Sequence, residues 1–226
     1  MSSPPIDLVL LVPTRGRPRN ITRLIGACAA TCTSRYLIHF GFDDDDPYLQ
    51  AGLDAADGHL TSVAPRMGLA PWTNRLAFAH LDKPRLCSIG DDMVPETPGW
   101  DTRLCAAAGP AGLAYPNDHR RDDIPECVVI ASSVVRVLGW FCEPSLQHWY
   151  VDNVWRDLGL GTDVLRYLPD VHVVHHHPNV TGDRGDPTYW DAAGLMGADL
   201  VAYQRWRMYR MKEDIAKVRR LNGMAV

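Results

Sequence analysis

The chain has 226 residues, of which 46% are hydrophobic and 22% charged, and its formal net charge is −4 at pH 7. This composition is typical of a globular protein and excludes disordered, collagen-like and disulfide-scaffold classes, while the acidic balance excludes a polycation that coats nucleic acid. At this length we expect one domain with a full hydrophobic core.

The N-terminal segment lacks the basic region and the long apolar stretch of a signal peptide. No apolar run approaches the about 20 residues that span a bilayer. The six cysteines form no CxxC pair, and we expect them to be small buried side chains. These features predict a cytoplasmic protein with no membrane contact.

The first half of the chain alternates apolar runs with amphipathic segments. Strands are predicted at 6–13, 36–42, 60–63 and 85–89, and helices from 21 onward and near 71–81. Asn20 is the expected N-cap of the first helix. Residues 6–13 are almost continuously apolar, which predicts a strand buried on both faces. The alternation predicts an α/β fold, with a mostly parallel sheet between helices.

The second half is less regular. Strands are predicted at 114–115, 128–131, 164–168 and 171–177, and helices at 133–138, 150–158 and 199–221. Residues 178–188 form a predicted loop rich in Gly, Asp and Pro. With no repeat or linker, residues 1–226 are predicted to be a single domain with a helical tail.

Polar clusters follow three of the predicted strands, at 14–19, 43–46 and 91–92. Ligands of open parallel sheets bind beyond the carboxyl ends of the strands. The arginine-rich turn at 14–19 offers forked donors to phosphates, or it is a solvated basic loop. It matches neither GxGxxG nor GxxxxGK[ST], which disfavours a Rossmann dinucleotide site and a P-loop.

The acidic residues at these strand ends suit different tasks. Asp43, the first residue after its strand, is best placed to reach a base or ribose, whereas two of the four aspartates at 43–46 fit an exposed turn that caps the next helix. Asp91 and Asp92 follow a dry strand and suit Mg²⁺ or Mn²⁺ shared with phosphates. A helix-capping pair is the competing interpretation of these two.

The segment His175-His176-His177 ends a predicted strand. Because side chains alternate along a strand, His175 and His177 share one face about 7 Å apart. They can bind one ion together or line one cleft. For any single histidine of the three, exposure at a strand end without a function is an equally good interpretation. Without HExxH or CxxC, a mixed Asp/His set favours Mn²⁺ over structural zinc.

Asp152 lies in the first turn of a predicted helix, one residue off its apolar stripe. It is interpreted either as a general base that faces a cleft or as a partner of the helix dipole. The spacing does not choose between these roles.

Together these segments resemble the GT-A glycosyltransferases, specifically the family 2-like group, over about the first 190 residues. The resemblance rests on five short segments, namely 12–18, 42–47, 90–101, 150–153 and the HHHP sequence at 175–178. It implies a GT-A-like (Rossmann-like) fold that binds a nucleotide-sugar, with a UDP-sugar favoured, and a divalent Mn²⁺ or Mg²⁺.

The resemblance also implies roles for individual residues. The expected nucleotide-sugar contacts are Pro13, Thr14, Arg15, Arg17, Asp43, Asn74 and Asp91. The expected metal ligands are Asp92, His175 and His177, and Asp152 matches the general base of inverting members. Gly90 replaces the first acid of the DxD motif, so the ribose contact is expected to shift to Asp91. Donor binding is assigned to about 1–115, acceptor binding and catalysis to about 116–190, and a helical tail to about 191–226.

Compact phage-type members of the group carry HxHP followed by Asp and Tyr, which Asp186 and Tyr189 match. Some relatives glycosylate hydroxymethylated bases in DNA. The basic C-terminal helix, with Arg120-Arg121 and Trp206, offers a phosphate-binding surface for such an acceptor. The competing and favoured interpretation is a solvated amphipathic helix that packs its Leu200, Tyr203, Trp206 and Tyr209 side.

Two other functions stay open at this point. A nucleotidyltransferase of similar architecture would attack a nucleoside triphosphate, although the chain has no lysine-containing glycine-rich segment after the first strand. A catalytically inactive module that binds nucleotide or DNA fits the incomplete DxD motif.

Overall fold

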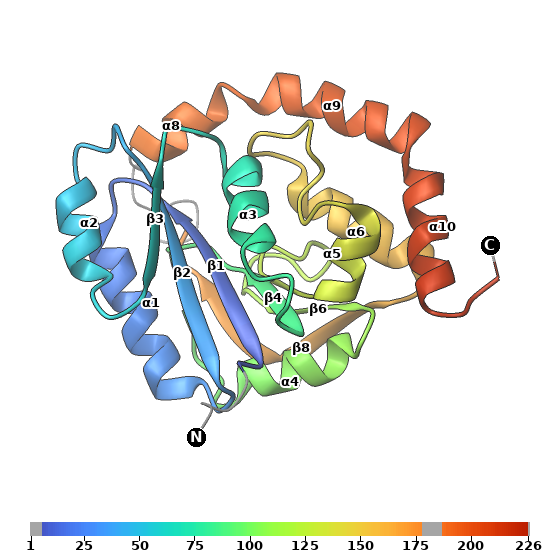
Figure 1. Cartoon of the computed structure of the whole chain (residues 1–226), viewed down its shortest axis with the longest axis horizontal. Coiled ribbons are helices and arrows are strands. Elements are labelled where there is room, and N and C mark those ends of the chain that lie inside the picture. Colours follow the sequence, from blue (N-terminus) through green and yellow to red (C-terminus); the bar gives the residue numbers. More distant parts are fainter. Residues whose placement is uncertain (1–5, 178–186, 226) are drawn as a thin grey trace.

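One mixed sheet organises the part of the chain that the computed structural model describes, residues 6–177 and 187–225. Its eight strands lie in the order β3-β2-β1-β4-β7-β6-β8-β5. Figure 1 shows β3, β2 and β1 side by side in this sheet. They are β1 (Leu8–Thr14), β2 (Tyr36–Asp43), β3 (Leu60–Ala64), β4 (Arg85–Ser88), β5 (Met93–Pro95), β6 (Leu113–Asn117), β7 (Val128–Ala131) and β8 (Leu165–His175). Parallel pairing joins β3, β2, β1 and β4, and also β6 and β8, while β7 and β5 pair antiparallel with their neighbours. The predicted mixed, mostly parallel sheet is confirmed.

Helices cover both faces of this sheet. They are α1 (Pro18–Thr31), α2 (Leu49–Ala55), α3 (Leu69–Phe78), α4 (Trp100–Ala108), α5 (Ser132–Leu138), α6 (Val151–Thr162), α8 (Pro187–Ala193), α9 (Met196–Tyr209) and α10 (Met211–Leu221). One core joins the sheet to α1, α2 and α4, and the other joins it to α3, α5, α6, α9 and α10. None of the described helices is long and apolar enough to cross a membrane.

The central strand β1 contributes to both cores. Val9 and Leu11 pack into the core under α3, α5 and α6, whereas Leu8, Leu10 and Val12 pack into the core under α1 and α4. All five side chains are fully buried. Alternating side chains on opposite faces therefore explain the nearly continuous apolar run, and the two-sided burial predicted for it is confirmed.

The N-cap prediction at Asn20 is wrong. Helix α1 begins at Pro18, and Arg17 occupies the N-cap position. Proline at the first helical position has no N–H to leave unpaired, and its fixed φ suits a helix start. Asn20 therefore lies inside the first turn, and its amide donates a 3.4 Å hydrogen bond to Asp91.

The predicted single helix at 199–221 is also wrong, because the segment forms α9 and α10. The break lies at Arg210, whose φ of −123° departs from the helical range. Buried Trp206 donates from its indole nitrogen to Asp214 at 3.0 Å, which ties the two helices together. Helix α10 then packs against α5 and α6.

Two further expectations about this part of the chain need correction. Trp206 is 2% exposed, so it cannot belong to a phosphate-binding surface. The packed side of α9 carries Tyr203 and Trp206 as expected, but Leu200 and Tyr209 are exposed.

Elsewhere the differences concern boundaries and short elements. The strands predicted at 164–168 and 171–177 are one strand, β8, with an irregular register opposite β6. Helix α4, helix α8 and strand β5 were not predicted. The strand predicted at 128–131 is confirmed as β7, and the other predicted elements are present with shifted ends. The predicted loop at 178–188 lies mostly outside the described residues, and its last two residues begin helix α8.

The packing of β2 against α3 generates a stability prediction. A Cβ at Gly41 would lie 2.7 Å from Cε3 of buried Trp72, so Gly41→Ala must displace that ring. We expect the free energy of unfolding to fall by about 1–3 kcal/mol in urea titrations. Gly26→Ala is the matched control, because Gly26 is an exposed residue of α1 with no atom within 4 Å of the new Cβ. It should be neutral or stabilise by up to about 1 kcal/mol, and equal losses in both variants would contradict the packing argument.

Candidate active site

The carboxyl ends of β1, β2 and β4 lie at one edge of the sheet because these strands are parallel neighbours. Thr14 ends β1 and Asp43 ends β2, and Asp91 and Asp92 follow β4. The Thr14 hydroxyl donates to Asp91 Oδ2 at 2.5 Å, and both residues are buried. The ends of β1 and β4 therefore meet, as predicted, and Asp43 lies at the same edge.

Arg17 connects the two aspartates after β4. Its Nη1 lies 3.1 Å from Asp91 Oδ1 and 3.4 Å from Asp92 Oδ2. Burial raises the pKa of Asp91, and the charge of Arg17 opposes that shift. The arginine-rich turn is therefore folded onto the acidic pair, and the solvated-loop interpretation does not describe Arg17.

The second strand end forms its own network. Asp43 Oδ1 accepts hydrogen bonds from Trp72 Nε1 at 2.7 Å and from the Met67 backbone N–H at 3.2 Å. Asp43 Oδ2 accepts from Arg15 Nη1 at 3.1 Å. Buried Asp46 accepts from the backbone N–H groups of Gly16 and Tyr48, which shapes the turn.

Asp92 lies at the centre of a cluster that includes both predicted histidine ligands. His175 Nε2 is 3.3 Å from Asp92 Oδ1, and the Tyr189 hydroxyl donates to Asp92 Oδ2. His177 packs edge-on against the rings of His175 and Tyr189, with centroid distances of 5.3 and 5.0 Å. Arg17 lies 4.3 Å from the centroid of the Tyr189 ring. Burial alone would raise the pKa of Asp92, but His175 and Arg17 lower it well below its usual range.

Gly90 gives a physical reason for the departure from the DxD pattern. A Cβ at this position would lie 2.6 Å from Asp92 Oδ1. No ordinary side chain fits there while the Asp92 carboxylate keeps its contact with His175.

The other ring nitrogen of His175 contacts a residue that sequence reasoning missed. His175 Nδ1 lies 2.6 Å from Glu126 Oε2, and Arg120 Nη1 lies 2.8 Å from the same oxygen. Burial would lower the pKa of His175, but its hydrogen bonds to Asp92 and Glu126 raise it to about 9. His175 is therefore a cationic ring held between two carboxylates at neutral pH.

Asp118, also missed, lies beside Glu126. It follows β6, which runs in the same direction as β8 and ends at the same edge. One ligand atom each from Asp118, Glu126 and His175 lie within 4.8 Å of one another, which suits a divalent cation. The strand-end rule could have found Asp118, but Glu126 lies in a loop without a pattern.

Asp152 occupies the first turn of α6, where the sequence predicted it. Its Oδ1 accepts from the Asn153 backbone N–H at 2.8 Å. Burial, together with the charge of Glu126, raises the pKa of Asp152 to about 6. Asp152 is thus in electrostatic range of the Glu126 carboxylate, and it titrates near neutrality.

A loop over residues 143–150 leads into α6 beside this cluster. Fully buried Asp199 of α9 holds it by accepting from the backbone N–H groups of Gln147, His148 and Trp149 at 2.8–2.9 Å. Burial lowers the pKa of His148, which also senses the charges of Arg17 and Asp92. Helix α9 therefore holds the loop that leads to Asp152.

Other predicted residues are placed differently. Asn74 bonds to the backbone of Phe141 and Cys142 through both ends of its amide, which pins that loop to α3. Its donor contact stays a prediction, as does that of Pro13, which pairs with Gly41 in the sheet. Pro178 and Asp186 lie outside the described residues.

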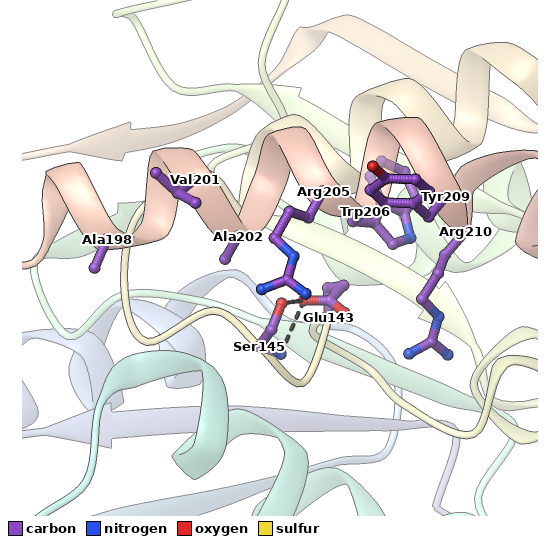
Figure 2. A pocket seen from close by; sticks show the side chains of 9 residues that line it. All are labelled: Glu143, Ser145, Ala198, Val201, Ala202, Arg205, Trp206, Tyr209 and Arg210. Atoms are coloured by element: carbon purple, nitrogen blue, oxygen red, sulfur yellow. Dashed lines mark hydrogen bonds between the residues drawn. The ribbon is translucent and has the colours of Figure 1, made fainter.

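A pocket of about 470 Å³ lies elsewhere, between α9 and the loop at 143–145. Figure 2 shows Glu143 and Ser145 facing the side chains of α9 across it. Ser145 donates to Glu143 Oε2 from its backbone N–H at 2.8 Å. None of the predicted catalytic, nucleotide-sugar or metal residues is among the described residues that line this pocket, so it does not belong to the candidate active site.

No protein-family model matches the chain, and no curated protein matches it by sequence. Solved structures do match its fold. The TarS 1-349 structure from S. aureus in complex with UDP has 10% sequence identity and a TM-score of 0.57, over 74% of this chain and 59% of that one. The mannosyltransferase PcManGT from Pyrobaculum calidifontis, in complex with GDP-Man and Mn²⁺, has 12% identity and a TM-score of 0.61, over 96% of this chain and 74% of that one.

These matches establish a GT-A-like fold for the chain. The match covers only 59% of the length of the TarS 1-349 chain in its complex with UDP. At 10–12% identity the matches carry the fold and leave the activity to be argued from the site.

Because the pKa of Asp152 is raised in the folded protein, ionisation of this carboxyl lowers the free energy of unfolding. An unfolded aspartate titrates near about 3.9. The proton on folded Asp152 therefore stabilises the protein below that value, and the stabilisation is lost as the pH rises through about 6. At pH 8 the free energy of unfolding of Asp152→Asn should be about 1–2 kcal/mol higher than that of the wild type. At pH 4.5 the difference between the two proteins should be much smaller.

Urea titrations at both pH values measure this difference. Exposed Asp163→Asn, at the other end of the same helix, is the control and should show no such pH dependence. A gain for Asp152→Asn that is equal at the two pH values would contradict the pKa assignment.

Proposed function

We propose that this chain is a glycosyltransferase that moves a sugar from a nucleotide-sugar to an acceptor hydroxyl with inversion of the anomeric centre. The observation that carries the proposal is the meeting of Thr14, Arg17, Asp91 and Asp92 at one edge of a GT-A-like sheet, with Asp152 in electrostatic range of Glu126 in the adjoining cluster. Assignment to the family 2-like group rests on the sequence motifs alone.

In this proposal the nucleotide binds over the ends of β1 and β2. Arg15 and Asp43 form an ion pair at that edge, at 3.1 Å, which offers a donor and an acceptor to the base and ribose. Arg17 would exchange part of its contact with Asp91 and Asp92 for the diphosphate, since a guanidinium binds phosphate oxygens in pairs. UDP is favoured as the nucleotide, and solved structures with this fold include complexes with UDP and with GDP-Man.

Asp152 is the proposed general base. It takes the proton of the acceptor hydroxyl while the oxygen bonds to the anomeric carbon and the nucleoside diphosphate leaves with the bonding electron pair. A single displacement of this kind inverts the anomeric centre. A pKa of about 6 leaves Asp152 deprotonated at neutral pH while keeping it more basic than an ordinary aspartate.

The departing diphosphate gains negative charge, which must be stabilised. Arg17 lies at the acidic pair and supplies one fixed cation. A divalent Mn²⁺ or Mg²⁺, when bound, would supply the rest. His175 belongs both to the ligand set expected from the sequence and to the cluster with Asp118 and Glu126.

The acceptor is left as a hydroxyl compound of unspecified type. A DNA acceptor has lost much of its support, because Trp206 is buried and Arg120 is paired with Glu126.

The activity test is release of UDP or GDP from nucleotide-sugars, with and without Mn²⁺. We expect Asp152→Asn to lower kcat at least about 100-fold while the dissociation constant of the donor changes little, because the base contributes in the transition state. Asp163→Asn should keep wild-type kcat. For the wild type, kcat/KM should fall as the pH drops through about 6, since protonated Asp152 cannot act as a base.

Normal turnover by Asp152→Asn would show that another group is the base. Pyrophosphate released from a nucleoside triphosphate would instead identify a nucleotidyltransferase. Nucleotide binding without turnover of any donor would identify a binding module.

A further inference from the structure

We propose that Asp118, Glu126 and His175 bind a divalent cation on the Nδ1 side of the imidazole. Asp92 then acts as an outer carboxylate that accepts from the Nε2–H of the same ring. This assignment replaces Asp92 and His177 as direct ligands. It concerns the resting protein and does not depend on sugar transfer.

Asp118 supplies the first argument. Its side chain is 2% exposed, and its Oδ1 accepts from the backbone N–H groups of Arg120 and Arg121 at 2.8 and 2.9 Å. Its Oδ2 is buried close to the Glu126 carboxylate and accepts no hydrogen bond from an N–H group among the described residues. A buried carboxylate oxygen without such a donor is costly, and a cation bound to it would offset that cost.

The two neighbours of that oxygen complete a suitable donor set. Ligand atoms of Glu126 and His175 lie within 4.8 Å of the Asp118 oxygen and of each other. Two carboxylate oxygens and one imidazole nitrogen suit Mn²⁺, and water or phosphate oxygens could fill the remaining positions. Binding would release the Nδ1 proton of His175 to solvent, because a histidine nitrogen binds a metal only when it is deprotonated.

The second nitrogen of His175 then has a defined role. A histidine ligand usually donates its other N–H to a carboxylate, which fixes the tautomer and the ring orientation. Asp92 Oδ1 lies 3.3 Å from Nε2 and fits that outer position.

The reverse assignment, with the cation on Asp92 and Nε2, is less favourable. Asp92 Oδ1 already faces His175, and Asp92 Oδ2 receives the Tyr189 hydroxyl and lies 3.4 Å from Arg17. A cation there would have to displace the Tyr189 hydroxyl and Arg17. At the proposed position it would displace the contact between His175 and Glu126 and those of Arg120, but it would gain Asp118 Oδ2, which accepts no hydrogen bond from an N–H group in the described part of the chain.

Arg120 competes for the proposed position. Its Nη1 lies 2.8 and 3.0 Å from the two Glu126 oxygens and 3.3 Å from His175 Nδ1. Its guanidinium therefore neutralises the same carboxylate that the cation would use. Removing this charge should strengthen cation binding, which is the opposite of what loss of a ligand does.

The test is a titration of the whole chain with Mn²⁺ alone, in which the electron paramagnetic resonance signal measures the concentration of free Mn²⁺. Asp118→Asn and Glu126→Gln keep the size of each side chain and should weaken binding at least about tenfold. Asp92→Asn retains an acceptor for the Nε2–H group of His175. It should weaken Mn²⁺ binding less than Asp118→Asn or Glu126→Gln does. Arg120→Gln should tighten it. Thermal melting of each variant confirms that it is folded.

Loss of Mn²⁺ binding in Asp92→Asn, with unchanged binding in Asp118→Asn, would place the cation on the aspartate pair and overturn the proposal. A wild-type chain that binds no Mn²⁺ at millimolar concentration would overturn it as well. Neither outcome bears on sugar transfer, which is measured separately through nucleotide release.

Discussion

The compensation of buried negative charge at one edge of the sheet is the constraint on which the site depends. Asp91, Asp92 and Asp118 are almost completely buried there, with Glu126 beside them. Carboxylates this close repel one another in a medium that screens poorly, so the folded state needs cations at the same edge. Arg17, His175 and Arg120 supply three, each from a different part of the chain.

This charge pattern links the fold to the proposed chemistry. Parallel pairing of β1, β2 and β4 brings Thr14, Asp43 and the acidic pair to one edge. The C-terminal helices complete the site from outside the sheet, because Asp199 holds the loop before α6, and Tyr189 of α8 contacts Asp92. A diphosphate and a divalent cation carry opposite charges, so both can enter such an edge by exchanging partners with groups already there.

Much of this arrangement could be predicted from the sequence because it depends on local patterns. The apolar run of β1 indicated a strand buried on both faces, and the strand-end rule brought Thr14 and Asp91 together. Glu126 and the structural role of Asn74 could not be predicted, since both depend on contacts between segments 49 or more residues apart. The break at Arg210 was missed for a different reason, because the segment has a uniform helical pattern and the hydrogen bond from Trp206 to Asp214 joins two helices that the pattern does not separate.

A crystal structure of the chain with an unreacted nucleotide-sugar and Mn²⁺ tests the central claim most directly. The account predicts the diphosphate beside Arg17, the nucleotide over Arg15 and Asp43, and the anomeric carbon on the side of the site that faces Asp152. A nucleotide-sugar bound away from this edge, for example in the pocket under α9, would contradict it.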